Sequence, residues 1–239
     1  YLLEALRTAQ IAVADTERLQ ILQDESIKDL FAEEQFDSYA VPQSEPVTEA
    51  YFSDALFLGD SLTQALAGYR YPDGVKELAS VCAYKGITPQ MILSDVKMEN
   101  VDGAIVQVQD EIREKNPSKI YLQMGENAMA GMQDQELVES YAELVDWLQE
   151  IFPQTPVFIQ AMPPVTKTVA TENVLMTNAR IRKINGMFAK LSQEKHCYFL
   201  DLYHALCDEE GNLPYGIARE DGIHLKEAGT KRWVRYLTE

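Results

Sequence analysis

Cysteine, histidine and basic residues are scarce in this chain, and each scarcity argues against a class of protein. Its three cysteines, Cys82, Cys197 and Cys207, lie in no paired spacing, so neither a disulfide scaffold nor a metal site is indicated. Lysine and arginine number 21 against 38 acidic residues, and the net charge of −17 disfavours nucleic acid and anionic lipid as partners. No run approaches the roughly 18 apolar residues of a membrane span, and no signal peptide is visible.

The remaining composition is that of a globular protein, with 46% hydrophobic and 25% charged residues. The first fifty residues differ from the rest, because acidic residues outnumber basic ones there by eleven to three. Apolar residues recur over residues 1–38 without a helix breaker, and the stretch 41–49 carries two prolines. We therefore expect a helical segment and linker over residues 1–50, followed by one domain over 51–239.

The role of the amino-terminal segment has two interpretations. A helical run that begins at Tyr1 rather than at methionine resembles the lower end of a stalk, and it is compatible with an upstream anchor. Equally, the helix could pack on the surface of its own domain. The first interpretation favours a location outside a bacterial membrane, whereas the unpaired cysteines fit a cytoplasmic protein equally well.

From Tyr51 onward, short apolar runs alternate with helical stretches. Five continuous apolar runs have the length and composition of strands that are covered on both faces. These runs are 55–58, 78–84, 120–124, 157–162 and 198–203. Between the later runs, and after the last, apolar residues fall at helical spacing, and the final helix is expected to bury Trp233 and Leu237. The alternation predicts an α/β fold with three α/β/α layers, a parallel sheet and right-handed crossovers.

The residues that follow the predicted strands have the chemistry of acyl transfer. Carboxyl ends of parallel strands meet at one edge of the sheet, where ligands bind in open α/β folds. That edge is expected to hold Ser61, Gly86, Asn127, Asp221 and His224. Acyl transfer needs a hydroxyl nucleophile, an imidazole that takes its proton, a carboxylate that orients the imidazole, and donors for the oxyanion.

Each of these residues also has a purely structural interpretation. Ser61 or Asp60 could cap the following helix, because serine and aspartate are favoured capping residues. Gly86 could serve a turn, and Asn127 could bond a loop backbone. It is the combination at successive strand ends, rather than any one residue, that predicts the chemistry.

The three histidines differ in their suitability as the base. His196 precedes a strand and therefore belongs at the opposite edge of the sheet. His204 lies at the right edge and has Asp201 three residues before it, so it competes with His224, although we expect it on the rim.

Four sequence blocks resemble the SGNH hydrolases, also called the GDSL esterase/lipase family. GDSL begins at Gly59, KGIT contains Gly86, GEN ends at Asn127, and DGIHL begins at Asp221, in the family's order. The similarity covers the whole 51–239 domain and implies a flavodoxin-like sheet of five parallel strands. One departure is Ala128, where the family commonly has aspartate after the block asparagine.

The resemblance implies a division of roles among these residues. Ser61 would attack an ester carbonyl, His224 would accept its proton and pass it to the leaving alcohol, and Asp221 would hold the other imidazole nitrogen. The oxyanion would lie among the N–H groups of Ser61 and Gly86 and the side chain of Asn127. No cofactor or metal is implied.

Substrate and reaction are less closely defined. We expect a serine esterase that acts on short acyl esters, acetyl above all, of carbohydrate or cell-wall glycan. An O-acyltransferase with the same triad and a catalytically idle domain that binds glycan or docks partners are the alternatives. Position alone makes Asp60, Glu126 and Pro163 candidates for substrate contact.

Overall fold

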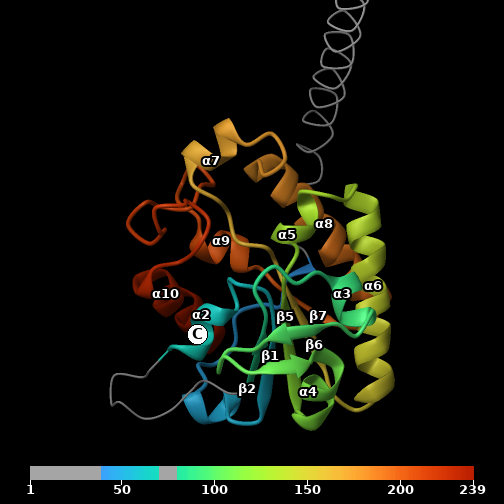
Figure 1. Cartoon of the computed structure of the whole chain (residues 1–239). Coiled ribbons are helices and arrows are strands. Elements are labelled where there is room, and N and C mark those ends of the chain that lie inside the picture. Colours follow the sequence, from blue (N-terminus) through green and yellow to red (C-terminus); the bar gives the residue numbers. More distant parts are fainter. Residues whose placement is uncertain (1–38, 70–79) are drawn as a thin grey trace, which may run out of the picture.

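The computed structural model describes residues 39–69 and 80–239, and its centre is a parallel sheet of five strands (Figure 1). The strands are β1 (Ala55–Gly59), β2 (Ser80–Ala83), β5 (Lys119–Gln123), β6 (Val157–Gln160) and β7 (Tyr198–Leu200). Their spatial order, β2-β1-β5-β6-β7, is the flavodoxin-like order. All five predicted strands are present, but the last ends at Leu200, and Leu202 and Tyr203, predicted as strand, are helical. The predicted helix over 1–38 lies outside the described residues.

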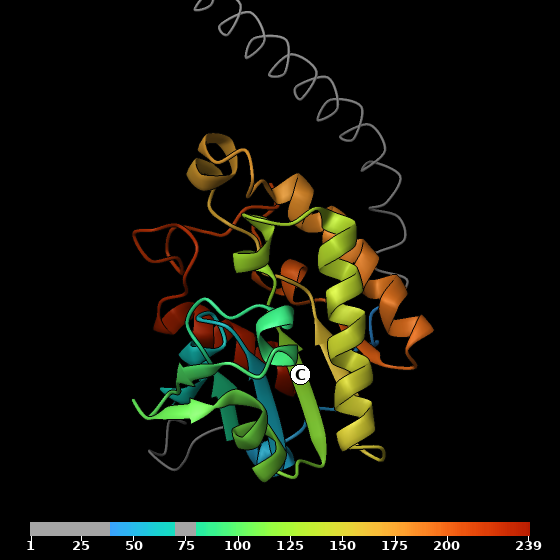
Figure 2. The same ribbon diagram turned by 45° about the vertical axis from the view of Figure 1, so that its right-hand side comes forward.

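Helices cover both faces of the sheet, as the α/β alternation predicts (Figures 1 and 2). The α-helices are α2 (Gln64–Ala67), α3 (Pro89–Leu93), α4 (Val108–Glu114), α5 (Glu126–Met129), α6 (Asp134–Ile151), α7 (Lys167–Glu172), α8 (Asn178–Glu194), α9 (Leu202–Leu206) and α10 (Glu227–Thr238). A 3₁₀ helix, η2 (Glu49–Phe52), precedes β1. The long helix α6 packs against α3 and α8, and α10 packs against α2 and α9.

The core lies on both sides of the sheet because the central strands carry apolar residues at successive positions. Every residue of β1 is buried, which explains why its run shows no polar alternation. On one face, Phe57, Tyr121, Phe158 and Tyr198 occupy paired positions on neighbouring strands, and their rings stack at centroid distances of 4.8–4.9 Å. Such offset stacks add to the stabilisation from burial itself.

A small antiparallel hairpin was not predicted. It consists of β3 (Lys97–Glu99) and β4 (Ile105–Gln107), and its turn is held by Asn100, whose side-chain oxygen accepts N–H groups of Asp102 and Ala104. The strands are three residues long and largely exposed, and Ile105 is 68% exposed. Strands this short, with no buried face, leave no periodic pattern in the sequence.

The stretch 41–47 is extended, as its prolines predict, and it lies against the domain. Val41 N–H donates to the Phe199 carbonyl of β7 at 2.9 Å, and Val47 N–H donates to the carbonyl of Thr238 in α10. Within α10, Trp233 is fully buried as predicted, whereas Leu237 is only partly buried. Across residues 39–69 and 80–239, no helix is long and apolar enough to cross a membrane.

Candidate active site

The turn after β1 places Ser61 at the carboxyl edge of the sheet. A Cβ on Gly59 would lie 2.0 Å from the Gln123 carbonyl oxygen and 2.1 Å from Thr63 Oγ1, so only glycine permits this close approach. The helix that follows is separated from β1 by a turn, and α2 begins only at Gln64. Its N-cap is Thr63. Ser61 therefore caps no helix, and its half-buried side chain is left for another partner.

That partner is His224. Ser61 Oγ lies 2.9 Å from His224 Nε2, although 163 residues separate them in sequence. His224 Nδ1 lies 2.9 Å from Asp221 Oδ2, so a carboxylate, an imidazole and a hydroxyl form one hydrogen-bonded series. In this arrangement the imidazole can take the hydroxyl proton while the carboxylate holds its other nitrogen.

The loop before α10 preorganises Asp221. Its Oδ1 accepts the N–H groups of both Ile223 and His224 at 2.9 Å, while Oδ2 contacts the imidazole. Partial burial raises the pKa of Asp221, but these two N–H groups and the His224 side chain outweigh it and leave the pKa below its usual value. Asp221 is therefore ionised at neutral pH, as an orienting carboxylate must be.

A second aspartate–histidine pair has the same spacing and lies elsewhere. His204 Nδ1 contacts Asp201 Oδ2 at 2.7 Å, and His204 N–H donates to Asp201 Oδ1. The His204 side chain is 43% exposed, in accord with the expected surface position. Ser61 pairs with His224 and not with His204, so the tertiary contact confirms the choice of His224 between two D-x-x-H patterns of the same spacing.

In the described part of the chain, the three groups predicted as oxyanion donors, on Ser61, Gly86 and Asn127, each have an N–H that is free to donate. Asn127 is exposed at the start of α5, and its Nδ2 donates one hydrogen to Asp60 Oδ2 at 3.1 Å, which leaves a second hydrogen on Nδ2. Gly86 is exposed in the turn after β2. Within the described residues, the N–H groups of Ser61 and Gly86 have no acceptor.

The three candidates for substrate contact are buried. Asp60 is fully buried and Glu126 is 5% exposed, and Pro163 is buried as well. A buried side chain presents no surface to a ligand, so this burial argues against direct contact with substrate. Asp60 and Glu126 instead belong to a polar network beneath the site.

Sequence reasoning missed the partners of that network. Gln123 ends β5 and is fully buried; its Nε2 donates to Glu126 Oε1 at 2.9 Å, and its Oε1 accepts from Thr63 Oγ1 at 3.0 Å. The available indication was a glutamine at the end of a buried strand, because a buried amide requires hydrogen-bond partners.

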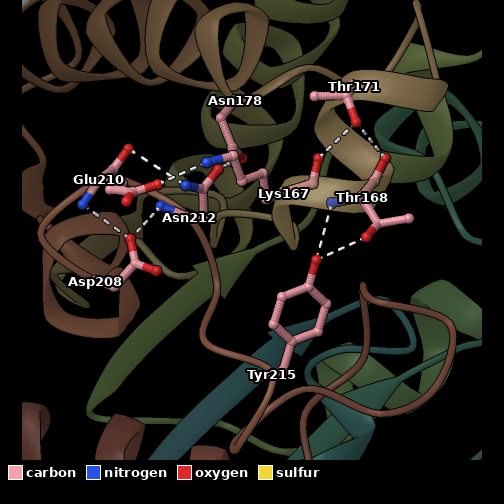
Figure 3. A network of polar contacts seen from close by, with 8 residues as sticks. All are labelled: Lys167, Thr168, Thr171, Asn178, Asp208, Glu210, Asn212 and Tyr215. Atoms are coloured by element: carbon pink, nitrogen blue, oxygen red, sulfur yellow. Dashed lines mark hydrogen bonds and ion pairs between the residues drawn. The ribbon is translucent and has the colours of Figure 1, made fainter.

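Helix α7 contacts the long loop between α9 and α10, and Figure 3 shows its contacts with Tyr215 and Glu210 of that loop. The Tyr215 hydroxyl contacts Thr168 Oγ1 at 2.6 Å and accepts the Thr168 N–H, while Lys167 pairs with Glu210 at 3.0 Å. The Thr166 N–H also donates to the Gly222 carbonyl at 2.9 Å.

Comparisons with known proteins agree with this architecture. Residues 57–232 match the GDSL-like lipase/acylhydrolase family, and no curated protein sequence matches the chain. The fold resembles a GDSL-like lipase from Bacteroides thetaiotaomicron (TM-score 0.57, 15% identity, covering 82% of this chain and 89% of that one). It also resembles the acetyl xylan esterase AlAXEase (TM-score 0.55, 18% identity, covering 76% of this chain and 95% of that one). A third similar structure is the acetylxylan esterase Axe2 from Geobacillus stearothermophilus (TM-score 0.54, 13% identity, covering 77% of this chain and 91% of that one). At these identities the structural neighbours establish the fold.

Proposed function

The chain belongs to the GDSL-like lipase/acylhydrolase family and is an ester hydrolase, and from this premise we propose that it is a serine esterase that removes short acyl groups, acetyl above all, from carbohydrate or cell-wall glycan. The observation that carries the proposal is the hydrogen-bonded series of Ser61, His224 and Asp221. His224 contacts both the proposed nucleophile and the proposed orienting carboxylate.

In the proposed mechanism, Ser61 Oγ attacks the ester carbonyl carbon while His224 Nε2 takes the hydroxyl proton. Negative charge develops on the carbonyl oxygen, which accepts hydrogen bonds from the Ser61 and Gly86 N–H groups and from Asn127 Nδ2. Collapse of this intermediate breaks the carbon–oxygen bond, and His224 gives its proton to the leaving alcohol. Water then attacks the acyl-enzyme with His224 again as base, which releases the acid and restores Ser61.

The preference for short acyl groups on a large alcohol rests on the shape of the site. Ser61 is half-buried, and the side chains of His224 and Asp221 are 34% and 48% exposed, so the reacting groups lie at an open surface. A long acyl chain would find little apolar surface to cover it there, whereas a bulky glycan could approach. Two of the fold neighbours act on acetylated xylan, which supports the same choice.

The test compares wild type with Ser61→Ala, at equal concentration, on p-nitrophenyl esters of increasing acyl length and on acetylated oligosaccharides. We expect wild type to favour acetyl over longer chains and to release acetate from the sugar, and we expect Ser61→Ala to do neither. Equal rates for the two proteins would refute Ser61 as nucleophile. Acetyl transfer to a glycan acceptor without free acetate would identify a transferase instead.

Location outside the cytoplasm is part of the proposal, since cell-wall glycans are found there. Fractionation of the producing cells, followed by immunoblotting, tests it. Recovery of the protein with cytoplasmic markers alone would refute this location.

A further inference from the structure

Two carboxyl groups lie buried side by side beneath the proposed site. Asp60 directly precedes Ser61 at the end of β1, and Glu126 directly precedes Asn127 after β5, the strand paired with β1. Asp60 is fully buried and Glu126 is 5% exposed. Within the described residues, neither carboxyl forms an ion pair with lysine or arginine. No lysine or arginine therefore offsets two negative charges in this interior.

The two carboxyl groups have unequal sets of donors. Asp60 Oδ1 accepts the Leu62 N–H at 2.9 Å, and Oδ2 accepts from Asn127 Nδ2 at 3.1 Å. Glu126 Oε1 accepts from Gln123 Nε2, but Oε2 is buried and receives no N–H or hydroxyl donor. The Glu126 side chain neighbours that of Asp60, so a carboxyl–carboxylate hydrogen bond can join them once one of the two groups carries a proton.

The environment determines which group keeps that proton. Burial, and next the neighbouring Asp60 charge, raise the pKa of Glu126 well above its usual value. Burial also raises the pKa of Asp60, but its hydrogen bonds with Glu126 and Leu62 and the nearby His224 oppose this rise. Two adjacent buried carboxyl groups cannot both ionise cheaply. Glu126 therefore holds the proton and Asp60 holds the charge.

We propose that Glu126 is a positioning residue, a neutral acid whose hydrogen bond to Asp60 holds the Asp60 carboxylate in place to orient the Asn127 amide toward the reacting oxygen. The inference rests on the proposed function, because that function makes Asn127 an oxyanion donor. Ionisation of Glu126 replaces the hydrogen bond by repulsion and releases Asn127. The other titratable groups that face the pair are Tyr141 of α6, whose pKa burial and both carboxyls raise, and His224.

Kinetics of two variants test the positioning role. Glu126→Gln keeps the shape and a neutral donor, so we expect kcat near the wild-type value at pH 7. Glu126→Leu has no donor and should lower kcat at least tenfold while KM changes little. As pH rises through the raised pKa of Glu126, kcat of wild type should fall, whereas Glu126→Gln should lack this fall. Glu150→Gln, the same change at an exposed position of α6, should behave as wild type.

Thermal unfolding tests the buried proton without relying on catalysis. A carboxyl whose folded pKa is raised loses stabilisation as pH rises from its unfolded pKa to its folded one. The Tm of Glu126→Gln minus that of wild type should therefore increase above about pH 4.5, and the difference for Glu150→Gln should stay constant.

The outcomes separate this inference from the esterase proposal. A constant Tm difference for Glu126→Gln from pH 4 to 9, or an unchanged kcat in Glu126→Leu, would overturn the inference even in an active esterase. An increasing Tm difference in a protein that hydrolyses no ester would instead refute the esterase and the positioning role, and would keep the protonated Glu126.

Discussion

At the scale of single residues, the site depends on which side chains contact one another rather than on which are present. Asp221–His224 and Asp201–His204 share sequence spacing and nearly the same contacts, and only the first histidine reaches Ser61. The roles we propose can therefore be tested by making the same change in both pairs.

Asp221→Asn should lower kcat by a factor on the order of 10²–10⁴, because an amide cannot accept from both the backbone and the imidazole and would favour the wrong tautomer. Initial rates on p-nitrophenyl acetate measure the effect. The matched control Asp201→Asn should leave turnover unchanged. A comparable loss in both variants would show that fold damage, not orientation of His224, is being measured.

Asn127→Ala should lower kcat by a factor on the order of 10²–10³, the usual effect of removing one oxyanion donor, with a smaller change in KM. The same assay, with Tm recorded to confirm folding, measures it. An unchanged kcat would remove Asn127 from the oxyanion site and with it the proposed purpose of the Asp60 carboxylate.

At the scale of elements, the strand ends and the short turns after them position the chemistry. Gly125 connects β5 to α5 with a φ of 143°, and a Cβ there would lie 2.6 Å from Met162 Sδ. The conformation of this short turn thus determines where Glu126 and Asn127, the first residues of α5, lie relative to the buried strand.

Gly125→Ala should destabilise the protein by about 1–3 kcal/mol, since it combines a strained backbone with a steric clash, and it should also lower kcat by displacing Asn127. Urea unfolding and ester hydrolysis measure the two effects. Gly131→Ala is the control, because a Cβ at Gly131 meets nothing within 4 Å. Equal stability of the two variants would refute the steric argument.

At the scale of the whole molecule, α10 directly follows the loop that carries His224 and packs against the sheet. Its Trp233 is fully buried, and Trp233 Nε1 donates to Gln160 Oε1 of β6 at 2.9 Å. Helix α10 is thereby attached to the sheet, and this attachment holds the carboxyl end of the loop that carries His224.

Trp233→Phe should lower the free energy of unfolding by about 1–3 kcal/mol, because it leaves the buried Gln160 oxygen without its donor. The urea midpoint at neutral pH measures this. Trp147→Phe, at a partly buried position of α6, should cost less. Equal losses would mean that aromatic volume, not the hydrogen bond, accounts for the effect.

The sequence by itself determined the fold class, because buried parallel strands read as continuous apolar runs and amphipathic helices recur at their own period. Because the carboxyl ends of parallel strands meet at one edge, the sequence also predicted one edge for the site residues Ser61, Gly86, Asn127, Asp221 and His224. The chain also matches the predicted family over residues 57–232. Local sequence patterns suffice to predict strands and amphipathic helices, because burial of their faces repeats with the period of the element.

Only the tertiary structure decided which groups contact one another and which are buried. Asp60 and Glu126 looked like substrate contacts from their position at the strand ends, yet both lie beneath the surface, where burial, and next the neighbouring Asp60 charge, raise the pKa of Glu126. Burial and charge coupling depend on residues distant in sequence, such as Tyr141, and no local pattern carries that information. The protonation of this pair, on which our further inference depends, is therefore a property of the folded molecule.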